Sequence, residues 1–239
     1  MSVMVVSGTG TEIGKTVVTA ALAAAARAAG RSVAVLKPAQ TGVEPGVPGD
    51  ADEVARLAGP GVTPVELARF PEPLAPETAA RRAGMAPVGP AEVAEAARKL
   101  AEEYDLVLVE GAGGLLVRYD ADGGTLADAA ALLGAPVLVV APAALGTLNM
   151  AALTAEALRA RGIVQAGVVV GSWPQRPGLA ERCNVTDLPV VAGAPLLGAV
   201  PAGAGTLAPA AFRAAAPGWL APGLGGGWDA EAFARAVRS

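Results

Sequence analysis

Gly8-Thr-Gly-Thr-Glu-Ile-Gly-Lys-Thr16 lies between an apolar run at residues 3–6 and a long alanine-rich stretch. A strand, a glycine loop and a helix in this order form an arrangement that binds phosphate. The helix that begins near Gly14 presents unpaired backbone N–H groups and the positive end of its dipole, and glycine lets a phosphate approach them. Lys15 adds a positive charge, and the Thr16 hydroxyl suits a magnesium ion. This stretch predicts a nucleotide-phosphate site.

The loop departs from the common spacing. Five residues separate Gly8 from Gly14, one more than in the usual phosphate-binding pattern. The alternative interpretation is a glycine turn that precedes a lysine and a threonine by coincidence. The strand before the loop and the helix after it favour a lengthened phosphate loop.

Composition limits the remaining possibilities. The chain has 239 residues, 53% of them hydrophobic and 3% aromatic, with a formal net charge of −4. This length suits a single domain, residues 1–239, with a core of small aliphatic side chains. Without a broad basic face or aromatic platforms, we expect no nucleic-acid partner.

Cysteine and histidine usage restricts the chemistry further. Cys183 is the only cysteine and the sequence has no histidine, so neither a disulfide within the chain nor a Cys/His metal site can form. Proton transfers must use other groups. Met1 leads directly into the first strand, so we expect no signal peptide and a cytoplasmic protein. Residues 129–155 are uncharged, but glycines and prolines divide them, so we expect a buried core and no membrane partner.

Apolar strands and helical stretches alternate along the chain. Strands are expected at residues 3–6, 32–36, 106–109, 137–141, 164–170 and 196–200, and helices at residues 50–58, 90–103, 125–133, 147–161 and 229–238. We interpret residues 39–49 as a loop and residues 60–76 as irregular, and the tail from about residue 202 is poorly patterned. Continuous apolar strands between helices predict a mostly parallel sheet covered on both faces, in a single P-loop NTPase-like α/β domain.

Ligands of such sheets bind at the carboxyl ends of the strands, where Lys37, Glu110 and Gly171 are expected. Glu110 emerges into the glycine turn 111–114 and suits magnesium, although strand ends also carry charge without function. Lys37 precedes a proline and would extend toward the γ-phosphate unless it is a surface lysine. We expect Lys37→Ala to fold normally and lose turnover, because its amine would contact only the reacting anion. Asp50 fits a metal ligand or the N-cap of the next helix, with Glu53 completing a capping box.

Four motifs in order, Gly8–Thr16, Lys37-Pro-Ala-Gln-Thr41-Gly42, Val109-Glu-Gly-Ala-Gly-Gly114 and Gly146-Thr-Leu-Asn149, make the chain resemble the dethiobiotin synthetase family over about its first 200 residues. The resemblance implies a cytoplasmic homodimer that uses ATP and Mg²⁺ to close a cyclic urea from 7,8-diaminononanoate and carbon dioxide (or bicarbonate). The residue inventory agrees, because the substrate supplies both nucleophiles and the enzyme positions anions.

The resemblance also assigns roles to residues. Lys15, Lys37 and Thr11 would be catalytic, and Thr16, Asp50 and Glu110 would hold magnesium. Thr41 would bind substrate, and the start of a partner subunit's helix would receive the substrate carboxylate at Gly146, Thr147, Leu148 and Asn149, where an anion suits a helix. The nucleotide-binding set comprises Glu12, Ile13, Gly14, Lys15, Thr16, Val17, Asp50, Glu110, Gly111, Ala112, Gly113, Gly171, Ser172, Val200, Pro201 and Ala202.

One departure concerns the base of the nucleotide. Many family members carry an adenine-reading asparagine after the sixth strand, where this chain has Gly171-Ser172-Trp173-Pro174. We therefore expect weak discrimination between ATP and CTP, which competition kinetics would measure. Three alternatives stay open: an ATPase switch of the cell-division or partition type, an amide-forming synthetase for corrinoid acids, and a nucleotide-binding regulatory module. A switch usually has a lysine at the start of the loop, and a corrinoid synthetase usually adds a glutamine-hydrolysing domain that we do not expect here.

Overall fold

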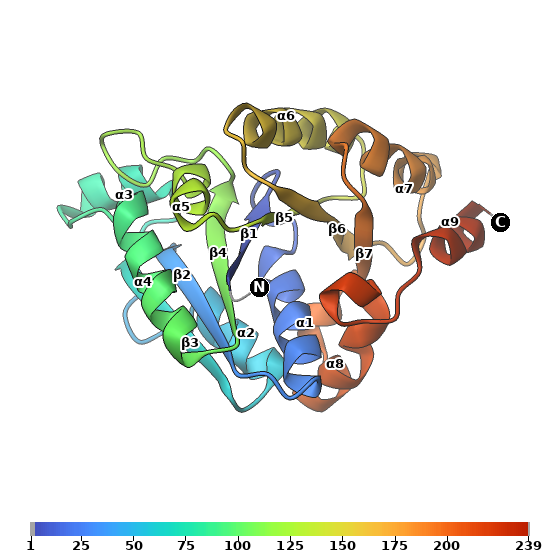
Figure 1. Cartoon of the computed structure of the whole chain (residues 1–239), viewed down its shortest axis with the longest axis horizontal. Helices are drawn as coiled ribbons and strands as arrows, with labels where there is room; N and C mark the ends of the chain where they lie inside the picture. The colour runs from blue at the N-terminus through green and yellow to red at the C-terminus, as the bar shows by residue number, and fades with distance from the viewer. Residues whose placement is uncertain (1–2, 239) are drawn as a thin grey trace.

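A single sheet of seven parallel strands organises the computed structural model, which describes residues 3–238 (Figure 1). The strand order is β3-β2-β4-β1-β5-β6-β7, and every pairing between neighbouring strands is parallel. The strands are β1 (Val3–Gly8), β2 (Val33–Thr41), β3 (Val62–Phe70), β4 (Leu106–Gly114), β5 (Val137–Ala141), β6 (Gln165–Trp173) and β7 (Leu196–Pro201). The expected parallel α/β domain is confirmed.

Helices pack on both faces of the sheet, which explains why the central strands are apolar without alternation. Val6 of β1 packs on one face with α1 (Lys15–Ala28), α2 (Asp50–Ala58) and α8 (Pro209–Ala215). Val5 packs on the other face with α3 (Pro76–Ala83), α4 (Pro90–Glu103) and α5 (Leu126–Leu133). Adjacent strand residues point to opposite faces, so both must be hydrophobic.

Toward β7, the second face continues under α6 (Thr147–Ala160) and α7 (Leu179–Ala192), and α9 (Ala230–Arg238) packs beside them. Three short 3₁₀ segments, Ala204–Thr206, Ala216–Trp219 and Pro222–Leu224, complete the C-terminal part. No helix among residues 3–238 is both long enough and apolar enough to cross a membrane.

The alanine content of α1 is explained by its position. Residues 18–26 of this helix are all buried, because it lies between the sheet, α2 and the C-terminal segments that include α8. Small side chains let the helix pack closely on several sides at once. The helix that begins at the phosphate loop is therefore anchored in the core.

Some sequence-based expectations were wrong. Residues 60–76 are not irregular, because they contain β3 and the first residue of α3. Pro64 lies within β3, an edge strand, where a missing N–H can be tolerated. Gly49, not Asp50, is the N-cap of α2. Glycine has no side chain that could accept a hydrogen bond, so only half of a capping box forms: Gly49 N donates to the carboxylate of Asp52, not Glu53, at 2.9 Å.

Candidate active site

A cavity of about 870 Å³ opens at the carboxyl ends of β1, β2 and β4. This is the edge at which parallel α/β sheets bind ligands. Residues of three predicted motifs line it together: Thr11, Glu12, Gly14, Lys15, Thr16, Lys37, Thr41, Asp50, Glu110, Ala112 and Gly113. Segments far apart in sequence thus meet at a single cavity.

The phosphate loop, residues 9–14, has a distinctive backbone. Gly14 has φ 92° and ψ 20° and precedes α1 without a side-chain cap, and Glu12 has φ 56° although it is not a glycine. A Cβ atom on Gly14 would lie 2.3 Å from the carbonyl oxygen of Gly171, so only glycine fits between the loop and the end of β6. Backbone N–H groups at the start of α1 are therefore free to receive an anion.

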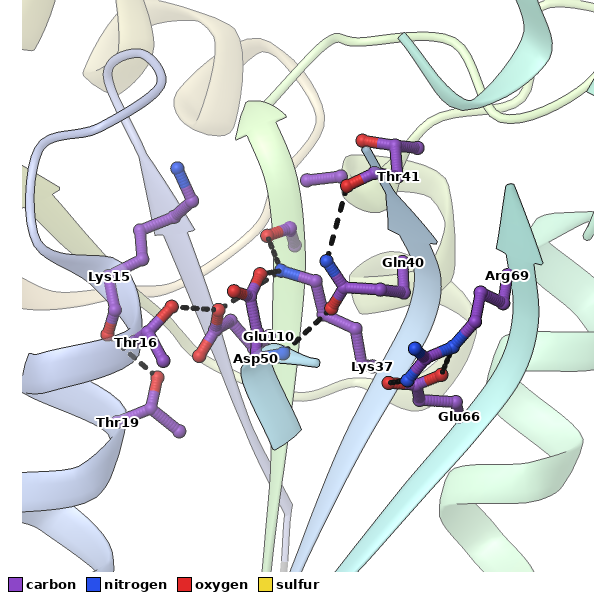
Figure 2. A network of polar contacts seen from close by, with 12 residues as sticks. Lys15, Thr16, Thr19, Lys37, Gln40, Thr41, Asp50, Glu66, Arg69 and Glu110 are labelled. Carbon is purple, nitrogen blue, oxygen red and sulfur yellow. Dashed lines mark hydrogen bonds and ion pairs between the residues drawn. The ribbon is translucent and has the colours of Figure 1, made fainter. Parts of the chain in front are cut away.

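Lys37 is the centre of the charged network in Figure 2. Its side chain is 3% exposed, and its Nζ lies 2.6 Å from Asp50 Oδ2 and 3.0 Å from Glu110 Oε1. It also donates to the Gly111 carbonyl at 3.1 Å. Burial alone would lower the pKa of Lys37, but the carboxylates of Glu110 and Asp50 outweigh it and raise this pKa above its ordinary value. Lys37 is therefore positively charged at neutral pH.

Lys15 behaves differently. Its Nζ donates to the Gly10 carbonyl at 2.7 Å. Burial, followed by the positive charge of Lys37, lowers the pKa of Lys15 to about 8. The two lysines of the site thus differ in their partners: Lys37 is paired with two carboxylates, whereas Lys15 donates to a backbone carbonyl.

Oxygen atoms from three elements surround this network. Thr16 Oγ1 donates to Glu110 Oε1 at 2.9 Å. Glu110 is 1% exposed, and its Oε2 atom is buried with no hydrogen-bond partner among residues 3–238. A buried carboxylate oxygen without a partner is costly unless a ligand or cation satisfies it. Together with Asp50, these are the hard oxygen donors that Mg²⁺ prefers, so the residues present fit a magnesium ion.

Other predicted residues do not line the cavity: Ile13, Val17, Gly111, Gly146, Thr147, Leu148, Asn149, Gly171, Ser172, Val200, Pro201 and Ala202. Gly171 nevertheless contacts the phosphate loop, because a Cβ atom there would lie 2.0 Å from the Ile13 carbonyl oxygen. Ala202 N donates to the Trp173 carbonyl at 2.7 Å, so the ends of β6 and β7 lie together. Neither Gly171 nor Ser172 supplies an amide side chain, and weak base discrimination stays a prediction.

The start of α6 lies outside this cavity. Gly146 has φ 91°, and Thr147 is 1% exposed with an Oγ1 atom that has no hydrogen-bond partner in the part of the chain that the structure describes. Asn184 of α7, also buried, donates to the carbonyls of Ala143 and Ala144 at 2.7 and 3.3 Å. The turn before α6 is therefore held by a side chain that the sequence analysis did not identify.

Several residues around the cavity were missed. Pro73, Leu74, Ala75 and Pro76 line it, but they lie in the stretch that looked irregular. Residues 111–114, expected to form a glycine turn, are instead the last residues of β4. Tyr119, 2% exposed, accepts a hydrogen bond from Ala112 N at 2.9 Å and so fixes this end of the strand. Gln40, which also lines the cavity, belongs to a motif already quoted, but only the fold gives it a partner.

The chain is similar to known proteins over nearly its whole length. A family model described as an AAA domain matches residues 2–209. A protein of Streptomyces avermitilis named ATP-dependent dethiobiotin synthetase BioD is 74% identical over 236 residues, 99% of each chain. Proteins with the same name from Saccharopolyspora erythraea and Rhodococcus jostii are 72% and 63% identical, covering 96% and 92% of this chain and 100% and 95% of theirs.

This chain belongs to the dethiobiotin synthetase family. It is accordingly an ATP-dependent ligase of biotin biosynthesis. Solved structures with the same fold include a ParA family ATPase from Chlorobium tepidum, with TM-score 0.56, 14% identity and coverage of 89% of both chains. Another is the MinC:MinD cell division complex of Aquifex aeolicus, with TM-score 0.55, 14% identity and coverage of 90% of this chain and 86% of that one. At such low identity these structures establish the P-loop NTPase-like fold alone, and the near-full-length match to dethiobiotin synthetases favours the synthetase over a switch.

Proposed function

We propose that this ligase forms the ureido ring of dethiobiotin from 7,8-diaminononanoate, carbon dioxide and ATP. One substrate amine adds to carbon dioxide and loses a proton, giving a carbamate. A carbamate oxygen then attacks the γ-phosphorus of ATP and ADP leaves. The second amine attacks the carbonyl carbon of this mixed anhydride, and phosphate departs as the ring closes. No protein nucleophile is needed, which suits a chain without histidine.

The observation that carries the proposal is the pair of lysines at one cavity. Lys37 comes from β2 and Lys15 is the first residue of α1, and both line the 870 Å³ cavity. In the proposed reaction Lys15 neutralises the transferred phosphoryl group, and Lys37 neutralises the carbamate beside it. Thr11 and Thr41, which line the same cavity, hydrogen-bond the diamine and the carbamate in this proposal.

We assign Thr16, Asp50 and Glu110 as the residues that hold Mg²⁺. The unpartnered Glu110 Oε2 atom supports this assignment. A bound magnesium ion would neutralise charge on the β- and γ-phosphates. The chain's own residues orient the nucleotide: backbone N–H groups after Gly14 bind phosphate, and the glycine-rich end of β4, residues 111–114, leaves room beside it.

The nucleotide base would lie beyond the phosphate loop, at the joined ends of β6 and β7. Gly171, Ser172 and residues 200–202 are the proposed contacts there. Their backbone groups are available to any base, which is the physical reason for expecting weak selectivity between ATP and CTP.

We further propose that the working unit is a homodimer in which α6 of one subunit approaches the cavity of the other. The start of α6 has a glycine in the left-handed region and the buried, unpartnered Thr147 hydroxyl, features that suit the substrate carboxylate. Exposed apolar side chains surround it. Leu116, Met150 and Leu153 are 45, 42 and 52% exposed and line a groove of about 300 Å³, and apolar patches of this kind mark interaction surfaces.

Release of ADP tests the function directly. The purified protein, Mg²⁺ and ATP are incubated with 7,8-diaminononanoate, with bicarbonate, or with both. We expect ADP release above background only with both, together with a product whose mass is that of the cyclic urea. Slow ADP release that ignores both substrates would instead indicate a nucleotide switch and contradict the proposal.

A further inference from the structure

The segment between β2 and α2, residues 42–49, connects two parts of the site. Thr41 lies before it and Asp50 after it, and it contains Gly42, Pro45, Gly46 and Pro48 without helix or strand. We call this segment the β2–α2 loop. The Asp50 side chain is 39% exposed, yet its carboxylate lies 2.6 Å from the buried Lys37 Nζ. The position of this carboxylate therefore depends on how the loop is held.

Gln40 fixes the end of the loop. It is 4% exposed, and its Oε1 atom accepts a hydrogen bond from Asp50 N at 2.8 Å. Its Nε2 atom donates to the Thr41 carbonyl at 3.2 Å. One amide side chain thus joins the last residues of β2 to the first residue of α2 (Figure 2).

Arg69 of β3 fixes the middle of the loop. Its Nη1 atom donates to the carbonyls of Glu44, at 3.1 Å, and Val47. Its Nε and Nη2 atoms donate to the two oxygens of Glu66, at 2.9 and 2.7 Å. The carboxylate orients the guanidinium, whose remaining N–H groups reach the loop. A planar group with several donors can do both, whereas a lysine amine cannot.

The loop packs directly against this pair. A Cβ atom on Gly49 would lie 2.2 Å from Glu66 Oε1, so the backbone touches the ion pair just before Asp50. In the pairing of β2 with β3, Glu66 lies opposite Lys37 and Arg69 opposite Gln40. The sheet therefore places Glu66 and Arg69, which contact the loop, beside Lys37 and Gln40, which contact Asp50 at its end.

An ordinary surface ion pair does not explain these contacts. Exposed pairs contribute little to stability, and Arg82 forms such a pair with Glu72 while it is 57% exposed. Arg69 is only 21% exposed, and its guanidinium also donates hydrogen bonds to two backbone carbonyls of one loop. Such contacts order backbone and do more than neutralise charge.

We propose that Gln40 and Arg69, the latter oriented by Glu66, are positioning residues that fix the β2–α2 loop and hold the Asp50 carboxylate beside Lys37. The proposal rests on the function above, in which Asp50 helps to hold Mg²⁺. Its first consequence, an ordered loop in the ligand-free protein, does not depend on that function.

Arg69→Lys is the decisive variant, because it keeps the charge opposite Glu66 and removes the planar fork. Hydrogen exchange of a peptide that covers residues 42–50 is measured without ligands. We expect exchange about tenfold faster than in the unchanged protein, with no change in core peptides of β1 and β4. Arg235→Gln is the control, since it removes an exposed arginine–carboxylate pair with Glu231 on α9, and we expect it to leave this peptide unchanged.

The same proteins are then assayed for turnover. Because displacement of a group by about 1 Å can cost about 100-fold in rate, we expect Arg69→Lys to lower kcat between about 10- and 100-fold. The Mg²⁺ concentration at half-maximal rate should rise about tenfold, and the KM for bicarbonate should stay the same. Gln40→Met should shift the Mg²⁺ requirement in the same direction.

Three outcomes separate the possibilities. Exchange of residues 42–50 at the original rate in Arg69→Lys would overturn the proposal, as would faster exchange with an unchanged Mg²⁺ requirement. If the unchanged protein releases no ADP that depends on both substrates, the proposed function fails, and the exchange experiment still decides whether Arg69 holds the loop.

Discussion

Two helices of this chain begin in nearly the same way and end up in different surroundings. Gly14 before α1 and Gly146 before α6 have φ 92° and 91°, and neither start has a side-chain cap. Around the first, the chain itself supplies Lys15, Thr16 and the Lys37 network. Around the second lie exposed apolar side chains, with Leu145 85% exposed.

The difference shows that backbone geometry alone does not define an anion site. Both helix starts offer free N–H groups, but only the start of α1 faces the 870 Å³ cavity and its countercharges. The start of α6 carries the buried, unpartnered Thr147 hydroxyl on the outside of that cavity. In the proposed homodimer, the first is complete within one chain and the second becomes useful when another copy brings its cavity to it.

Removal of Lys37 should have the largest effect and should damage the first site alone. We expect Lys37→Ala to lower kcat at least about 1000-fold, because the reacting anions lose a buried positive charge. Dimerisation through α6 should be unaffected. Initial-rate kinetics and size-exclusion chromatography with light scattering measure the two properties.

We expected Lys37→Ala to fold normally, on the assumption that the Lys37 amine contacts only the reacting anion. That assumption was wrong. Its Nζ lies 2.6 and 3.0 Å from Asp50 and Glu110 in the ligand-free protein. Loss of one member of a buried ion pair costs about 3–5 kcal/mol, so we now expect lower stability in urea unfolding. Lys99→Ala, which removes an exposed pair with Glu95, should change neither stability nor turnover noticeably. Near-normal turnover in Lys37→Ala would remove Lys37 from the mechanism.

A charge on the exposed face of α6 should affect the second site alone. We expect Leu153→Asp to convert the dimer to a monomer, since a carboxylate would have to be buried at the interface. The KM for 7,8-diaminononanoate should rise at least about tenfold if one carboxylate–helix contact is lost. Nucleotide binding, measured by calorimetry, should stay the same.

Val190→Asp is the control for this change, because Val190 is also exposed, at 78%, but lies on α7. We expect it to remain a dimer with an unchanged KM. The proposed role of the start of α6 is contradicted if Leu153→Asp stays dimeric, or if it becomes a monomer that binds the diamine normally.

The same comparison shows what sequence could predict. Glycine spacing, apolar strands and the motif Lys37–Gly42 were sufficient to place Lys15, Lys37 and Glu110 at one sheet edge, because parallel strands bring their carboxyl ends together. For Asp50 the local pattern left a metal ligand and a helix N-cap open, and the family resemblance assigned it to the magnesium site. Local pattern could not find β3, because Pro64 interrupts it. Because β3 was not predicted, Glu66 and Arg69 were not identified either. Their role depends on the pairing of β2 with β3, in which the paired residues lie about 30 positions apart in the chain.

The smallest effect is expected for Lys15 at the start of α1, where nucleotide affinity should change with pH. Lys15 has a pKa of about 8, because burial and then the charge of Lys37 oppose protonation. A bound triphosphate favours the charged amine, so binding above pH 8 must take up a proton. Affinity should therefore be nearly constant below pH 8 and about tenfold weaker for each pH unit above it. Calorimetry at pH 9 in two buffers with different ionisation enthalpies should show proton uptake, and Lys15→Arg, which stays charged, should remove it. The start of α6 has no part in this titration. At saturating nucleotide, the pH dependence of the KM for 7,8-diaminononanoate should therefore be the same in Lys15→Arg as in the unchanged protein. A different pH dependence of this KM in Lys15→Arg would show that the two helix starts are coupled.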